Sequence, residues 1–214
     1  MTAPTESETL LEVTDLRTRF RTPAGTVRAV DGVSLTLDRG RTLGIVGESG
    51  SGKSVLSRSI MGLLPKRNVT CEGSIVYDGR EISSLPPAER RKLWGADMAM
   101  VFQDPMTALN PVIRIGRQIT EGLRFHLGLD RRTANENALA LLRSVGIPEP
   151  ERRMKQYPHE LSGGMRQRIM IAVALACGPK LLFADEPTTA LDVTVQAQIL
   201  NLLARQQRER NMAM

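Results

Sequence analysis

Three kinds of residue or segment that define common protein classes are scarce in this chain. Aromatic side chains make up only 3% of the 214 residues, which argues against a nucleic-acid binder built on stacking platforms. The two cysteines, Cys71 and Cys177, lie far apart and lack metal-ligand spacing, so neither a disulfide framework nor a zinc site is expected. The best apolar run, 169–177, is far shorter than the about 18 residues of a membrane span. Because residues 1–8 are polar and lack the apolar core of a signal peptide, we expect a cytoplasmic protein.

The positive charge is spread along the chain. A formal net charge of +6 and a pI near 9.9 suggest nucleic acid or an anionic membrane as partner. The basic runs, such as 89–92, 131–132 and 151–153, mostly have acidic neighbours. This pattern is typical of solvated helix faces and disfavours nucleic acid, although it remains compatible with a basic face near anionic lipid headgroups.

Strand and helix patterns alternate along the chain. Alternating or continuous apolar residues predict strands at 10–20, 27–30, 33–37, 42–46, 74–77, 98–102 and 180–184. The run 42–46 is expected to be buried, and Asp78-Gly79 to form a tight turn. Helical patterns cover 53–64, a short stretch after Pro86-Pro87, most of 104–159, 164–176 and 193–207. Within the third of these, Thr133 and Glu136 have capping-box spacing.

This order of elements indicates an α/β protein with one domain across residues 1–214. We expect residues 9–103 and 164–214 to form an α/β core around a mostly parallel sheet, with an antiparallel β subdomain in its N-terminal part. The all-helical stretch 104–163 is predicted to be a helical subdomain inserted into that core.

The segment 47–54 fits the phosphate-loop pattern G-x-x-x-x-G-K-[ST] and lies between a predicted strand and a predicted helix. Its glycines allow backbone N–H groups to face phosphate, and the helix N-terminus adds positive potential. Lys53 is predicted to reach the β- and γ-phosphates of ATP, and the Ser54 hydroxyl to bind Mg²⁺. A dinucleotide fingerprint is excluded because no third glycine follows at the required position. The predicted ATP-binding residues of the loop are Gly47, Glu48, Ser49, Gly50, Ser51, Gly52, Lys53 and Ser54.

Polar side chains follow two of the predicted buried strands. Asp185 and Glu186 come directly after the run 181–184, where a parallel sheet places groups that face a ligand. Asp185 is predicted to hold Mg²⁺, and Glu186 to polarise the attacking water. Gln103 follows 98–102 in the same way, so its amide could reach both the metal and the water.

A second candidate phosphate site precedes the helix at 164–176. Ser162, Gly163 and Gly164 place a hydroxyl and backbone N–H groups at a helix N-terminus. The nucleotide on the phosphate loop of one chain needs only one site for its γ-phosphate. A second site is explained if two copies face each other and each completes the nucleotide site of the other.

With these residues in order, the chain resembles the ATP-binding cassette ATPases. The segment 161–165 is similar to their signature sequence, with Met165 where the commonest form has glutamine. The loop 47–54 resembles Walker A, 181–185 Walker B, Glu186 the catalytic glutamate and Gln103 the Q-loop residue. The segment 190–192 resembles the D-loop, which implies that Asp192 lies at a dimer interface. The resemblance extends from about residue 10 across essentially the whole chain. It implies that 9–103 and 164–214 form an ATP-binding core of the RecA-like, P-loop NTPase type.

The subfamily that the chain resembles consists of importers for oligopeptides, dipeptides and nickel. The segments 101–111, 157–168 and 186–192 carry this resemblance. It implies a second ATPase subunit, membrane permease subunits contacted near Asp104 to Pro111, and an extracytoplasmic solute-binding protein. The chain would then lie peripherally on the cytoplasmic face of the cell membrane. The alternative for 104–111 is a plain Asn/Pro loop.

Other expectations from the resemblance are less specific. The family stacks an aromatic ring on adenine, for which Phe20 is the candidate, with a core phenylalanine as the alternative. Its switch histidine lies roughly thirty residues beyond the glutamate, a position that neither His126 nor His159 matches. In the family, a buried strand precedes this histidine, and residues 211–214 stand where that strand begins. We therefore expect a truncated subunit. Two further functions stay open, namely a soluble cassette ATPase acting on nucleic acid or ribosomes, and a regulatory module without hydrolysis.

Overall fold

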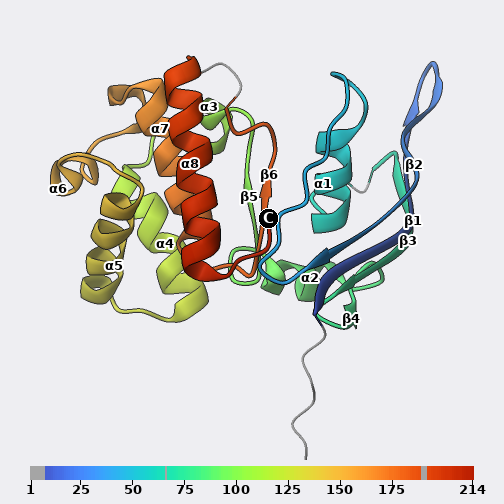
Figure 1. The fold of residues 1–214 in the computed structure, drawn as a ribbon, viewed down its shortest axis with the longest axis horizontal. Coiled ribbons are helices and arrows are strands. Elements are labelled where there is room, and N and C mark those ends of the chain that lie inside the picture. The colour runs from blue at the N-terminus through green and yellow to red at the C-terminus, as the bar shows by residue number, and fades with distance from the viewer. Residues whose placement is uncertain (1–7, 66, 189–191) are drawn as a thin grey trace, which may run out of the picture. The chain divides into compact units, whose positions relative to one another are not determined.

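The computed structural model describes residues 8–65, 67–188 and 192–214, which fall into two compact units. Unit 1 contains the described residues up to Trp94 together with Ala213 and Met214, and unit 2 contains Gly95–Met212. Figure 1 shows an antiparallel sheet with helices in unit 1, and several helices beside a short parallel sheet in unit 2. The predicted α/β class is confirmed.

Unit 1 is built on a four-stranded antiparallel sheet in the order β2-β1-β3-β4. Its strands are β1 (Thr9–Thr22), β2 (Gly25–Asp38), β3 (Val69–Tyr77) and β4 (Arg80–Glu81). Alternate apolar side chains of β1 and β3 are buried in register with each other. These pairs are Leu11 with Tyr77 and Val13 with Ile75.

Two local predictions for this sheet have different outcomes. The runs 27–30 and 33–37 are one strand and not two, because β2 continues through the irregular pairing near Gly32, where φ is 75°. The tight turn is confirmed: Asp78 has a φ of 51° and Gly79 a φ of 73° between β3 and β4. Positive φ at both central residues is what a two-residue hairpin turn requires.

Unit 1 also contains the helices α1 (Lys53–Met61) and α2 (Pro87–Leu93). The last carbonyls of α1 receive side-chain donors from α2 and the residue that follows it. Arg90 Nη2 donates to Ile60 O at 3.2 Å, and Trp94 Nε1 donates to Met61 O at 2.9 Å. These contacts satisfy groups that a helix end otherwise leaves without partners.

The predicted buried strand at 42–46 is wrong for this structure. The segment has no strand assignment, and the Val46 side chain is 97% exposed. Its backbone bonds are Leu43 N–H to Met214 O at 2.8 Å and Met214 N–H to Arg41 O at 2.9 Å. An apolar run forms a strand only where a neighbouring strand pairs with it along its length. Within unit 1, the described residue that pairs with this segment is Met214 alone.

Unit 2 has a parallel pair of strands, β5 (Met98–Val101) and β6 (Leu181–Ala184), in which Met98 pairs with Leu181 and Val101 with Ala184. The four residues of β5 are buried. This agrees with the prediction from its continuous apolar run, because strands covered on both faces lack alternation.

The helices of unit 2 lie beside this pair of strands (Figure 1). They are α3 (Pro105–Ala108), α4 (Ile115–Leu127), α5 (Arg131–Ser144), α6 (Pro150–Arg153), a 3₁₀ turn (Pro158–Glu160), α7 (Gly163–Leu175) and α8 (Val193–Arg210). α7 is central, since it packs against β5, α3, α4 and α5. Seven of its thirteen residues are buried, so this helix links the other elements of the unit.

The capping prediction for α5 is wrong by three residues. The helix begins at Arg131, and the Asp130 side chain accepts hydrogen bonds from Arg132 N–H at 2.7 Å and Thr133 N–H at 3.0 Å. Thr133 instead donates its hydroxyl to the Asp130 carboxylate at 2.8 Å. Asp130 supplies a charged acceptor earlier in the chain and so takes the N-cap position.

No helix in the part of the chain that the structure describes has both the length and the hydropathy to cross a membrane.

Candidate functional site

The phosphate-loop segment, residues 47–54, lies in unit 1 and leads directly into α1. Gly50 and Gly52 have φ values of 82° and 94°, in the region that only glycine adopts readily. A Cβ atom at Gly52 would lie 2.2 Å from the carbonyl oxygen of Ala29. The loop therefore needs glycine at position 52 for both its backbone angle and its close approach to β2.

Lys53 folds back over this loop. Its Nζ donates to Gly47 O at 2.8 Å and to Glu48 O at 2.9 Å, while Ser51 N–H donates to Glu48 O at 3.2 Å. Ser54 is the second residue of α1. An ammonium group, glycine-rich backbone and a helix N-terminus are thus gathered within eight residues, which fits a nucleotide phosphate chain.

Phe20, the predicted adenine-stacking residue, lies near the end of β1 in the same unit. It pairs in register with Val27 of β2 and Val69 of β3, and its side chain is half-buried. This exposure suits either a stacking ring or a core phenylalanine, so its role stays a prediction.

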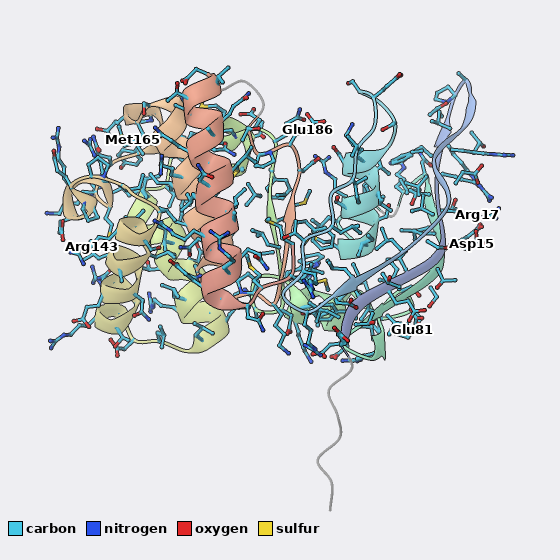
Figure 2. The ribbon with its side chains drawn as sticks, in the orientation of Figure 1. Asp15, Arg17, Glu81, Arg143, Met165 and Glu186 are labelled. Atoms are coloured by element: carbon cyan, nitrogen blue, oxygen red, sulfur yellow. The ribbon has the colours of Figure 1, made fainter. Side chains whose placement is uncertain are left out.

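The second half of the predicted site lies in unit 2, at the carboxyl ends of β5 and β6 (Figure 2). Asp185 N–H extends the parallel ladder by donating to Val101 O at 2.9 Å. Just beyond, Gln103 Nε2 donates to Glu186 Oε2 at 2.9 Å. The structure thus brings together two predicted residues that are 83 positions apart in the sequence. We call this group of Gln103, Asp185 and Glu186 the carboxyl edge.

Backbone strain and burial distinguish the two acidic residues of the carboxyl edge. Glu186 has a φ of 46°, a left-handed conformation that costs a non-glycine residue about 1 kcal/mol or more. Such strain persists where the surroundings hold the residue in place. Asp185 is 5% exposed, which makes it a buried carboxylate beside the exposed Gln103–Glu186 pair.

The oxygen atoms of the carboxyl edge fit a magnesium ion. Mg²⁺ is usually held by one or two carboxylates with water and substrate phosphates, so a dense acidic cluster is not required. Within residues 8–65, 67–188 and 192–214, no group of three or more His, Cys, Asp or Glu side chains is arranged to hold a metal. The Asp185 carboxylate and the Gln103 amide oxygen are hard donors of the appropriate kind.

Two glutamines that the sequence analysis did not single out hold the segment after Glu186. Gln167 of α7 donates from Nε2 to Pro187 O at 2.5 Å, and Gln196 of α8 donates from Nε2 to Thr188 O at 3.2 Å. Gln167 lies between two arginines, before the apolar run 169–175, so its sequence context resembles that of an exposed residue. Neither partner is detectable from sequence periodicity.

The predicted signature residues form the start of α7. Ser162 is the N-cap, and its Oγ accepts a hydrogen bond from Met165 N–H at 3.4 Å. Gly163 and Gly164 are the first two helical residues, and a Cβ at Gly163 would meet nothing within 4 Å. Figure 2 labels Met165 in this first turn. The arrangement leaves space beside backbone N–H groups at the beginning of a thirteen-residue helix.

Asp192, predicted at a dimer interface, is the N-cap of α8, where its Oδ1 accepts from Val195 N–H at 2.9 Å. The preceding D-loop residues, 190–191, lie outside the described residues. The cap gives Asp192 a local structural role, and its predicted interface role is untested by this geometry.

The segment 104–111, predicted to contact a membrane permease, is held by side-chain hydrogen bonds. Asp104 caps α3 by accepting from Met106 N–H at 2.8 Å. Gln118 of α4 accepts from Asn110 N–H at 2.9 Å and donates to Asn110 O at 2.9 Å and Ile113 O at 2.7 Å. This segment is therefore anchored to α4 while Met106 stays exposed.

The chain resembles known proteins across most of its length. The family model described as "ABC transporter" matches residues 30–189. The oligopeptide transport ATP-binding protein OppD of Haemophilus influenzae is 55% identical over 204 residues, covering 95% of this chain. The dipeptide transport ATP-binding protein DppD of Bacillus subtilis is 53% identical over 203 residues, covering 94% of it. The chain spans 63% of the length of the first relative and 61% of the second.

A solved structure has a similar fold. The ATP-binding cassette MJ0796, in a dimeric post-hydrolysis state bound to ADP and Pi, aligns with a TM-score of 0.84 and 27% identity. The alignment covers 95% of this chain and 85% of that one. The matched family region contains the phosphate-loop segment, the signature residues and the carboxyl edge. The chain belongs to the ABC transporter family.

Proposed function

We propose that this chain binds and hydrolyses ATP as the energy-supplying subunit of an importer for peptides or a similar small solute. The observation that carries the proposal is the carboxyl edge, where the Gln103 amide meets Glu186 at 2.9 Å beside the buried Asp185. A structural loop has no need for a strained, exposed glutamate paired with an amide across two parallel strands. The phosphate loop supplies the complementary binding chemistry.

In this proposal, the phosphate loop binds and the carboxyl edge performs the chemistry. Lys53 and the loop N–H groups stabilise negative charge on the β- and γ-phosphates. Glu186 polarises a water molecule for attack on the γ-phosphorus, and Gln103 orients the Glu186 carboxylate through the observed hydrogen bond. Bound Mg²⁺ would supply charge neutralisation on the phosphate oxygens, with Ser54, Asp185 and Gln103 as its protein partners.

The complete site is proposed to need a second ATPase subunit. Ser162, Gly163 and Gly164 present a helix N-terminus with space beside it, which suits the γ-phosphate bound by a partner chain. The dimeric state of MJ0796 with ADP and Pi supports this arrangement. Asp192 is proposed to lie at the same interface.

The importer role follows from relatives and from segment 104–111. OppD and DppD are named as peptide transport ATP-binding proteins, and we extend that role to this chain. The anchored segment with exposed Met106 is proposed to contact a membrane permease, which places the protein peripherally at the cytoplasmic face of the membrane. A solute-binding protein would complete the system, and residues 104–163 would act as the helical subdomain that carries the signature.

Affinity purification of the tagged protein from native membranes tests this function. We expect two polytopic membrane subunits to copurify, and ATP hydrolysis by the complex to rise when a peptide-loaded binding protein is added to proteoliposomes. Copurification with ribosomes or nucleic acid, in the absence of membrane subunits, would favour the soluble cassette alternative instead.

A further inference from the structure

The loop that carries Glu186 is attached to the helix that carries the signature residues. Gln167 lies in α7, one turn beyond Ser162, Gly163 and Gly164. Its side-chain amide donates to Pro187 O at 2.5 Å, immediately after Glu186. A single side chain therefore connects the two elements.

The environment of Gln167 makes this connection specific. The residue is 2% exposed, one of the few buried polar residues of the described chain. A buried amide without a partner is destabilising, so the position of the Gln167 side chain is determined by the acceptor it finds. Because the acceptor is a backbone carbonyl, only the NH₂ group can face it, which fixes the amide orientation.

A second amide reinforces the attachment from another helix. Gln196 in the first turn of α8 donates to Thr188 O at 3.2 Å. With Gln103 donating to the Glu186 carboxylate at 2.9 Å, three glutamine amides hold three consecutive residues, 186–188. The left-handed backbone at Glu186, with φ of 46°, is therefore supported from α7, from α8 and from the residues that follow β5.

From this geometry we propose that Gln167 is a positioning residue for Glu186. It transmits the state of the signature helix, set by the nucleotide on the partner chain, to the hydrolytic glutamate of its own chain. The inference rests on the proposed function and adds to it a physical connection between the two nucleotide sites of a dimer. Gln167 itself touches neither the nucleotide nor the water.

The test is a double-mutant cycle between Gln167→Met and Glu186→Gln, measured as ATP hydrolysis by the purified protein. Methionine keeps the side-chain length but removes the donor. We expect Gln167→Met to lower kcat by about tenfold to a hundredfold, because misplacement of reacting groups by about 1 Å can cost about a hundredfold. ATP affinity should stay within twofold. In the Glu186→Gln background, the same substitution should change the residual rate by less than twofold.

Two further variants guard against loss of folding as the explanation. Gln196→Met removes the half-buried amide that holds Thr188. We expect it to lower kcat by about threefold, and to have no such effect when Glu186 is replaced. Gln206→Met removes a buried glutamine of α8 whose bonds go to Glu209 and Arg210. That control should lower thermal stability without changing kcat.

The outcomes distinguish failure of the positioning role from failure of the proposed function. Equal fold-changes for Gln167→Met with and without Glu186 would overturn the positioning role while leaving ATP hydrolysis intact. An unchanged kcat in both Gln167→Met and Gln196→Met would overturn it as well. If the parent protein hydrolyses no ATP, the proposed function fails, and this inference fails with it.

Discussion

The phosphate loop of unit 1 is held together by hydrogen bonds within eight residues of chain, whereas the carboxyl edge of unit 2 is held by side chains up to 83 positions apart. The loop gets its shape from glycines, one lysine and the start of a helix. The edge gets its shape from two parallel strands and three glutamine amides. Under the proposed function, the binding site would therefore be encoded locally, whereas the hydrolytic site would depend on the assembled fold.

The largest effect is expected at the carboxyl edge. Glu186→Gln should lower kcat for ATP by about a thousandfold, within the range for losing a general base, while ATP affinity remains. Radiolabelled phosphate release and equilibrium ATP titration measure the two quantities. Glu121→Gln, an exposed glutamate of α4, is the control. A similar decrease in both variants would show that Glu186 has no special role.

At the phosphate loop, the expected defect is in binding. Gly52→Ala places a Cβ 2.2 Å from Ala29 O at a φ of 94°, so the loop must deform. We expect ATP affinity to fall by about tenfold or more, because the lost geometry holds several N–H donors together. Gly128→Ala is the matched control, since its φ is 66° but no atom lies within 4 Å. ATP affinity that falls equally in both variants would contradict the assignment of the loop.

The sequence predicted several local features and the strand ends that carry Gln103 and Glu186, but it missed the side-chain contacts that hold them. The turn at Asp78-Gly79, the strand β5 and the glycine loop follow from residue type and short spacing. The predicted strand at 42–46 fails because an apolar run cannot reveal whether a neighbour will pair with it. The Gln167–Pro187 bond was not predicted because a buried amide has no periodic signal that identifies its acceptor.

A smaller effect concerns a carboxylate that is not part of the predicted site. Glu81 (Figure 2) accepts hydrogen bonds from the hydroxyls of Ser74 and Ser83 and from the backbone N–H groups of Ser83 and Ile75, and these lower its pKa from 4.5 to about 2. The folded state thus gains stability above pH 4.5, and this contribution is lost as the pH falls toward 2.

Urea unfolding between pH 7 and pH 2.5 measures this contribution. Because Glu81 is exposed, we expect Glu81→Gln to cost only about 1 kcal/mol at pH 7 and less at pH 2.5. Glu12→Gln on β1 is a control with an exposed carboxylate of the same sheet. A cost for Glu81→Gln that does not decline at low pH would contradict the hydrogen-bond explanation.

The smallest expected effect distinguishes the predicted helix cap from the observed one. Asp130→Ala should destabilise the protein by about 1 kcal/mol, the usual cost of losing an N-cap. Thr133→Ala should cost roughly half as much, because its hydroxyl only supports the cap. Thermal denaturation of both variants measures the difference. A larger cost for Thr133→Ala would restore the capping box that the sequence suggested.

Complementation between two inactive variants tests the central claim most directly. Lys53→Ala removes the phosphate-loop lysine, and Ser162→Arg blocks the signature helix, so each variant alone should hydrolyse almost no ATP. A mixed dimer contains one intact site, formed by the loop of the Ser162→Arg chain and the signature of the Lys53→Ala chain. We therefore expect mixing to restore up to about a quarter of the parental rate, since half of the dimers are mixed and each carries one of two sites. No recovery on mixing, with dimers shown to exchange subunits, would contradict a site shared between two chains.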